Sequence, residues 1–199
     1  MLRVADADVL PMHFGSFADT LDGYVTELHE LADQKRKAAE ELGKLLDQNA
    51  FGLVADPTRP LLAPEREPEV PYLDFAALDN VAARLKKSAK AYDDRYAKFV
   101  AGSSRLSAEQ SRQLDDLLRG MEGTLIGARG LPGREWYKHL IYAPGLFTGY
   151  GVKTVPGVRE AIEQNHWDEA NQYVGFTAAA LSAYCDRLDK ATALLGGGA

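Results

Sequence analysis

The amino-acid sequence predicts an all-α fold, an antiparallel four-helix bundle with a long Pro-rich crossover and a long ordered aromatic loop. Two observations predict it. Apolar residues recur at steps of three and four over long stretches, and no stretch shows the alternation typical of a strand. The 199 residues, 46% of them apolar, suffice for one domain with a sizeable core. We therefore expect residues 1–199 to form a single helical domain.

The first helix is expected at about residues 16–48. Eight of nine positions in a heptad-like series are apolar there. A helix of this length is roughly 45–50 Å long at about 1.5 Å per residue, so we expect packing partners along most of it. The nine positions are Phe17, Leu21, Tyr24, Leu28, Leu31, Lys35, Ala38, Leu42 and Leu45.

Residues 52–73 are expected to form an extended crossover, because they contain five of the nine prolines. Proline has no backbone N–H to donate and disfavours helix at the residue before it. The segment also carries Leu61, Leu62 and Tyr72, so we expect it to lie against the protein surface.

A second helix is expected at about residues 74–100, with Asp74 as its candidate N-cap. A third, at about 107–125, opens with Ser107 and Gln110 at the spacing of a capping box. A short helix at 156–164 and a last helix at 168–195 complete the expected elements.

Residues 127–155 are expected to form a long ordered loop rich in glycine, proline and aromatic side chains. Loops of this length are uncommon unless they are functional or disordered, and the many large apolar residues argue against disorder. The loop could close one end of the bundle, or it could be a recognition surface on a rigid scaffold. These two interpretations are compatible.

Composition excludes several classes of function. The net charge is −6 and no basic stripe is present, which argues against a nucleic-acid partner. No window approaches 18 consecutive apolar residues, so no membrane segment is expected. The single cysteine, Cys185, excludes an internal disulfide and a thiolate zinc site, and its place deep in a helix favours a buried structural thiol.

No complete catalytic constellation is present in the sequence. Glu163 and His166 form a single Glu-x-x-His pair, whereas a di-iron bundle needs two such pairs and two further glutamates. We expect this pair to be a coincidence, and we expect neither catalytic nor metal-ligating residues in the chain. A metal-binding helix-bundle enzyme that uses Glu163 and His166 is kept as an alternative.

Two motifs carry a resemblance to a known family. Leu131-Pro-Gly-Arg-Glu-Trp-Tyr-Lys-His-Leu-Ile-Tyr-Ala-Pro144 and Val155-Pro-Gly-Val-Arg-Glu-Ala-Ile162 resemble signatures of the transferrin-receptor-like dimerisation domain. This is the C-terminal domain of the glutamate carboxypeptidase II family, also known from prostate-specific membrane antigen and NAALADase. The segments 2–11 and 71–78 are also similar to bacterial members of that family.

The resemblance implies a parent protein with a two-zinc peptidase domain upstream of residue 1. The opening residues lack an apolar signal-peptide core and read like the middle of a longer chain, so we expect a fragment. The implied role is a scaffold that forms a homodimer, contacts the parent's own peptidase domain and contributes one wall of its peptide substrate pocket. Family members often lie outside the cytoplasm, which leaves a periplasmic or extracellular parent open.

The resemblance also implies two substrate-binding positions. Glutamate-selective members have an adjacent Lys-Tyr pair that grips the substrate's terminal carboxylate. Tyr150 matches that tyrosine, whereas Gly149 stands where the lysine would be, and Lys153 is near without matching. We expect the parent's selectivity for C-terminal glutamate to be reduced. A stand-alone helical interaction module with no peptidase relative remains the other alternative.

Overall fold

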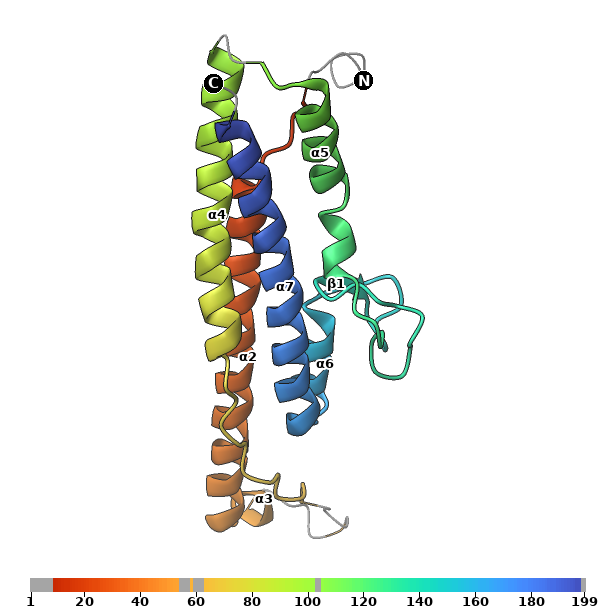
Figure 1. Cartoon of the computed structure of the whole chain (residues 1–199). Helices are drawn as coiled ribbons and strands as arrows, with labels where there is room; N and C mark the ends of the chain where they lie inside the picture. The colour runs from red at the N-terminus through yellow and green to blue at the C-terminus, as the bar shows by residue number, and fades with distance from the viewer. Residues whose placement is uncertain (1–8, 54–57, 59–62, 103–104, 198–199) are drawn as a thin grey trace.

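The computed structural model describes residues 9–53, 58, 63–102 and 105–197. Three long helices lie along one another, and shorter elements pack beside the last of them (Figure 1). In chain order the elements are α2 (Gly15–Asp47), α3 (Ala50–Leu53), α4 (Ala76–Ala101), α5 (Ala108–Arg119), the 3₁₀ helix η1 (Glu122–Leu125), β1 (Tyr142–Pro144), β2 (Val152–Thr154), α6 (Pro156–Glu163) and α7 (Trp167–Gly196).

The predicted all-α class is confirmed. The strands that the structure describes are two three-residue segments, paired antiparallel, with Tyr142 opposite Thr154 and Pro144 opposite Val152. No described helix is long and apolar enough to cross a membrane.

Helices α2 and α4 run antiparallel. His29, in the middle of α2, contacts Asp79 near the start of α4, with 2.9 Å between Nε2 and Oδ1. At the other end, the backbone N–H of Gly15 donates to Asp93 at 3.0 Å. Helices α5 and α7 are antiparallel in the same way.

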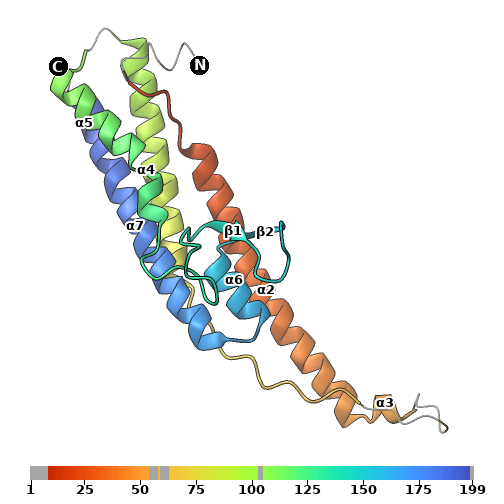
Figure 2. The ribbon, with the colours of Figure 1, turned by 90° about the vertical axis from the view of Figure 1, so that its right-hand side faces the viewer.

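Helices α4 and α7, in contrast, run parallel. The backbone N–H of Asp74, just before α4, donates to Asn171 in the first turns of α7 at 3.3 Å. Farther along both helices, Arg84 donates to Asp186 at 2.6 Å. Figures 1 and 2 show both helices ascending from the same end of the molecule. The chain therefore returns through α5 and the 127–155 loop before α7 begins.

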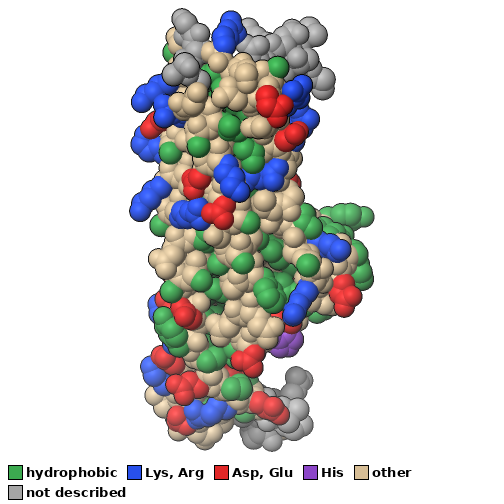
Figure 3. Space-filling model, viewed as in Figure 1, with side chains coloured by type: hydrophobic (Ala, Val, Ile, Leu, Met, Phe, Trp, Pro, Cys, Tyr) green, Lys and Arg blue, Asp and Glu red, His purple; other side chains and the backbone are tan. Residues whose placement is uncertain are grey.

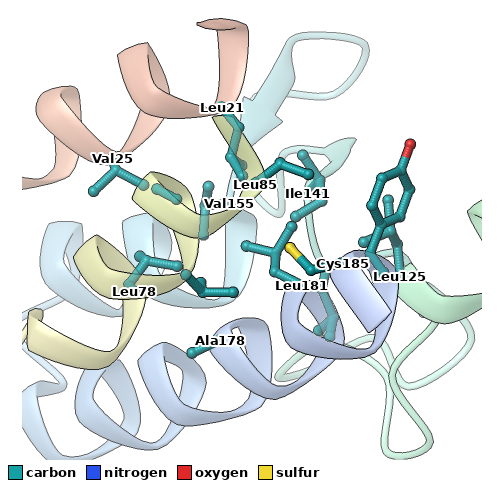
Figure 4. Packing of buried hydrophobic residues seen from close by; sticks show 14 of the residues in the cluster. Leu21, Val25, Leu78, Leu85, Leu125, Ile141, Val155, Ala178, Leu181 and Cys185 are labelled. Carbon is teal, nitrogen blue, oxygen red and sulfur yellow. The ribbon is translucent and has the colours of Figure 1, made fainter. Parts of the chain in front are cut away.

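The core lies where α2, α4 and α7 meet. Helix α7 has buried residues along its whole length, and in Figure 4 Leu21, Leu85 and Ile141 point toward one another from α2, α4 and the loop. The buried residues of α7 include Val174, Thr177, Leu181, Tyr184, Leu188, Ala191 and Leu195.

Helix α2 departs from its expected face. Its buried side chains from Ala18 to Ala32 are spaced three and four residues apart, as in the heptad-like series, but they share only Leu21 and Leu28 with it. Phe17, Tyr24 and Leu31 of that series lie at the edge of the buried face and are partly buried. Gly43 is the one buried residue of α2 after Ala32, because α4 begins beside the middle of α2 (Figure 1). The expectation of packing along most of its length is therefore wrong. The buried set is Ala18, Leu21, Val25, Leu28, Ala32 and Gly43.

Two expectations about where helices begin and end need correction. The third helix is not continuous to residue 125: α5 ends at Arg119, and Gly120, a poor helix former, caps it before the separate turn η1. Asp74 is not the N-cap of α4, which begins at Ala76, although its carboxylate accepts the Ala76 N–H at 2.9 Å.

The crossover is attached by other residues than expected. Tyr72 is 83% exposed, whereas Val70 and Leu73 are buried. Leu61 and Leu62 lie outside the described residues. The segment before α4 thus contacts the body through its aliphatic side chains and leaves its aromatic ring in solvent.

Candidate functional site

The 127–155 loop is the most unusual part of the surface, and it protrudes beside α7 and α6 (Figure 1). In the space-filling view, hydrophobic side chains gather over this protrusion (Figure 3). Large apolar side chains rarely gather on an exposed protein surface unless they form an interaction site. Its exposed large apolar residues are Trp136, Tyr137, Tyr142, Leu146, Phe147, Tyr150 and Val152.

The inner face of the same loop belongs to the core. Leu131, Leu140, Ile141, Ala143 and Val155 are all buried. The loop therefore closes one side of the bundle with its inner residues and leaves its outer aromatic residues exposed. The packing role is seen in the inner residues, and recognition by the outer residues stays a prediction.

Two tight backbone positions fix the path of the loop. Gly130 has φ +74°, and a Cβ atom there would lie 2.1 Å from the carbonyl oxygen of Glu135. Its own carbonyl accepts a buried 2.7 Å hydrogen bond from the hydroxyl of Tyr173. Val155, just before α6, has φ +44°, which is a strained conformation for a β-branched residue. Its N–H donates to the carbonyl of Ile141 at 2.6 Å.

A buried ion pair lies beneath the loop. Arg134 is 3% exposed and Glu160, on α6, is 7% exposed, and Nη2 of the arginine donates to Oε2 of the glutamate. Nη1 of Arg134 also donates to the carbonyl of Pro144, and Oε1 of Glu160 accepts the N–H of Leu146 at 2.8 Å. One pair of side chains thus holds the end of β1 and the residues after it.

A second polar cluster lies at the outer edge. The Nδ1 atom of His139 accepts the backbone N–H of Ile141 at 3.2 Å, which places the ring proton on Nε2. That Nε2 donates to Glu122 at 2.8 Å, and the Tyr142 hydroxyl donates to the same carboxylate oxygen at 2.9 Å. This hydrogen bond to Glu122 raises the pKa of Tyr142 above its ordinary value. The cluster thus ties the edge of the sheet to η1.

The predicted substrate-binding positions lie at the tip of the loop, between β1 and β2. Tyr150 is fully exposed, and Gly149 before it has φ +59° with open space around its Cβ position. The ammonium group of Lys153 is engaged elsewhere, because its Nζ atom pairs with Glu163 on α6 at 2.7 Å. The tip therefore presents a phenol and no ammonium group from this lysine.

The alternative metal site is not assembled. Glu163 pairs with Lys153, and Nδ1 of His166 lies 3.8 Å from Glu169. Among the described residues, no three His, Cys, Asp or Glu side chains group in a way that could hold a metal ion.

Cys185 is fully buried, and burial raises the pKa of its thiol to about 11. The thiol is therefore protonated near neutral pH and is a poor nucleophile.

Sequence reasoning missed the Arg134–Glu160 pair. Arg134 lies inside the motif that carries the family resemblance, but nothing in the spacing of the two residues indicates a contact across 26 positions. The available signal was weak: Glu160 stands among the apolar residues Val158, Ala161 and Ile162 of a short helix that must bury one face.

Comparison with known proteins finds one family and several relatives. Residues 73–189 match the family described as the transferrin receptor-like dimerisation domain. The chain is 48% identical over 162 residues to a probable glutamate carboxypeptidase of Arabidopsis thaliana, which covers 81% of this chain and 18% of that protein. It is 31% identical over 106 residues to a probable glutamate carboxypeptidase of Arthroderma benhamiae, covering 52% of this chain and 14% of that protein.

A third relative differs in its description. It is an inactive zinc metalloprotease of Schizosaccharomyces pombe, 28% identical over 192 residues, which cover 86% of this chain and 24% of that protein. The chain thus spans no more than about a quarter of these relatives. The family match covers more than half of the chain and includes both motifs that carried the resemblance. The chain belongs to the transferrin receptor-like dimerisation domain family of glutamate carboxypeptidase-like proteins.

Proposed function

We propose that this chain is the dimerisation and scaffold domain of a zinc peptidase, and that it contributes one wall of the substrate pocket without catalytic residues of its own. Three relatives are named as probable glutamate carboxypeptidases, and the chain spans between 14% and 19% of their lengths. The proposal assigns the peptidase chemistry and its two zinc ions to the remainder of such a protein.

The observation that carries the proposal is the position of Tyr150. Its side chain is fully exposed at the tip of a loop whose base is held by buried contacts. A phenol in this place adds nothing to the packing of its own domain, whereas its hydroxyl can donate a hydrogen bond to a carboxylate on a neighbouring molecule. We assign that carboxylate to the peptide substrate bound by the parent's peptidase domain.

Gly149 bears on substrate selectivity. An ammonium group beside Tyr150 would add a charge-assisted hydrogen bond to a substrate carboxylate, typically about 1.5–3 kcal/mol. Gly149 supplies none, and Lys153 is engaged by Glu163. We propose that the parent prefers a C-terminal glutamate less strongly than an enzyme with a lysine at position 149.

Self-association is the second part of the proposal. The exposed aromatic residues of the loop are the kind of side chains that interfaces bury. The homodimer buries part of this surface, and the parent's own peptidase domain covers another part. Sedimentation of the purified chain measures the first contribution, and replacing Trp136 by Gln is expected to weaken association. Exposed Tyr72, on the crossover, provides the control variant Tyr72→Gln.

Kinetics of the longer peptidase test the role of Tyr150. The variant Tyr150→Phe is expected to raise KM about tenfold with a smaller change in kcat, because a substrate-binding hydrogen bond is lost. The control Tyr72→Phe removes the hydroxyl of another exposed tyrosine and is expected to change neither constant. Unchanged kinetics in Tyr150→Phe would remove this residue from the pocket.

Activity of the isolated chain tests the assignment of chemistry. We expect the pure 199-residue chain to cleave no peptide and to carry no stoichiometric zinc or iron by elemental analysis. Peptide cleavage that a chelator abolishes would contradict the scaffold role and favour the metal-binding alternative at Glu163 and His166.

A further inference from the structure

We propose that Arg134 and Glu160 are positioning residues that set the conformation of the loop tip, residues 145–151, and thereby the direction of Tyr150. This inference deepens the proposed function and rests on it for the role of Tyr150. The two side chains touch no substrate themselves. They act through the backbone on either side of the turn that follows β1.

The hydrogen bonds of the tip carry the argument. Gly145 N–H donates to the carbonyl of Gly151 at 2.8 Å, and Gly151 N–H donates to the carbonyl of Thr148 at 3.1 Å. The hydroxyl of Thr148 also donates to Gly151 at 3.1 Å. These bonds close the tip on itself and do not join it to a helix.

The bond from the Leu146 N–H to Glu160 is different. Among the described residues, it is the hydrogen bond that joins the backbone of the tip to a helix, at 2.8 Å. Its acceptor is a buried carboxylate, and the same carboxylate is held by Arg134, which also binds the carbonyl of Pro144. The tip is thus fixed at its first residues through two side chains, one from the loop and one from α6.

Burial makes this attachment specific. A buried charge that loses its partner is strongly unfavourable, so the arginine and the glutamate hold each other in one geometry. A glutamate alone would turn toward solvent, and an arginine alone would leave the Leu146 N–H without an acceptor. Only the complete pair presents Oε1 to the tip.

A double variant separates this role from stability of the fold. In Arg134→Met/Glu160→Leu an apolar pair of similar size replaces the ion pair, which often leaves stability unchanged or improved. Neither new side chain can accept the Leu146 N–H. We expect hydrogen exchange of residues 145–151 in the 199-residue chain to accelerate about tenfold, while amides of α4 and α7 change less than about twofold.

Two further variants keep the test decisive. Glu160→Gln retains an oxygen that can accept from Leu146, and its tip is expected to exchange more slowly than that of the double variant. Glu27→Gln breaks another ion pair of α6, between Glu27 and Arg159, and is expected to leave the tip unchanged. Unchanged exchange in the double variant, or equal exchange in Glu160→Gln and the double variant, would overturn the positioning role.

The longer peptidase supplies the functional readout. If the tip positions Tyr150, the double variant raises KM about tenfold with kcat within about threefold, as Tyr150→Phe does. Faster tip exchange with unchanged KM would support the positioning role of Arg134 and Glu160 but would remove Tyr150 from the pocket. Failure of the inference and failure of the proposed function therefore give different results.

Discussion

The hydroxyl of Tyr173 on α7 donates a buried 2.7 Å hydrogen bond to the carbonyl oxygen of Gly130 in the loop. It joins the longest irregular segment to the helix with the most complete buried face. Burial raises the pKa of this phenol above its ordinary value, so the donor is present through neutral and mildly alkaline pH. The stability of the loop is therefore expected to depend on one phenolic proton.

Replacing Tyr173 by Phe tests this bond. The ring stays and the buried carbonyl of Gly130 loses its partner, so we expect the free energy of unfolding to fall by about 1–2 kcal/mol. Denaturant unfolding followed by far-UV circular dichroism measures it. A matched variant is Tyr92→Phe, because the Tyr92 hydroxyl is buried with no hydrogen-bond partner among the described residues. That variant is expected to be neutral or stabilising, and a loss equal to that of Tyr173→Phe would contradict both assignments.

The contact between Gly157 and Tyr173 gives a second prediction. A Cβ atom on Gly157 would lie 2.1 Å from Cδ1 of the Tyr173 ring. Gly157→Ala is therefore expected to lower the free energy of unfolding by about 1–3 kcal/mol through overpacking. The control Gly175→Ala, within α7, meets no atom within 4 Å and is expected to raise it by about 0.5–1 kcal/mol. Thermal unfolding of the two variants in parallel decides the outcome, and two changes of the same sign would refute the packing argument.

The capping box at the start of α5 gives a third prediction. The hydroxyl of Ser107 accepts the Gln110 N–H at 3.2 Å, and the Gln110 side chain accepts the Ser107 N–H at 2.9 Å. Ser107→Ala is expected to cost about 0.5–2 kcal/mol, measured by denaturant unfolding. Ser107→Asp keeps an acceptor at the N-cap and should recover most of that loss. If Ser107→Ala is as stable as the unaltered chain, the cap contributes nothing to the stability of α5.

The buried thiol gives a prediction about pH. In the folded chain burial raises the pKa of Cys185 from 9.0 to about 11, so the unfolded chain releases this proton first as pH rises. The stabilising contribution is fully present below pH 9 and is lost progressively as pH rises to 11. Burial also raises the pKa values of Tyr92 and Tyr184 above 10.0, which adds to the loss of stability from about pH 10 upward.

The variant Cys185→Ala isolates the contribution of the thiol. We expect it to be less stable at pH 8, because a buried side chain is shortened, but to lose less stability between pH 9 and 11 than the unaltered chain. Chemical denaturation at a series of pH values measures both slopes. Parallel slopes would show that the thiol ionises equally well in the folded and unfolded chains.

The helices could be predicted from the sequence because their apolar residues recur every three or four positions. The described bounds of α2, α4, α6 and α7 lie within two residues of the expected ranges. Glycines and capping residues are harder to weigh, which is why the break after Arg119 was not expected. The predicted face of α2 is rotated from the buried one, because the sequence pattern favoured the large residues Phe17, Tyr24 and Leu31, whereas the close packing of α4 buries the smaller Ala18, Val25 and Ala32.

The geometry of the loop could not be predicted in the same way. The sequence indicated an ordered segment with Tyr150 and Gly149 in it, yet the division into a buried inner face and an exposed outer face depends on tertiary contacts. Glycine is required at position 130 by a clash, and the backbone of Val155 is strained. Neither feature produces a repeating pattern of residues that could be recognised in the sequence. The roles of Tyr150 and Gly149 in substrate binding remain predictions.

The parallel arrangement of α4 and α7 has a consequence for how the chain reaches its native state. Contacts between these helices join residues about 100 positions apart, as in the pair Arg84 and Asp186. Such distant pairings slow folding, because a large loop must close before the contacts form. During synthesis α2 and α4 leave the ribosome well before α7, the helix that covers them. The apolar seam of the nascent α2–α4 hairpin is therefore exposed until α7 has emerged.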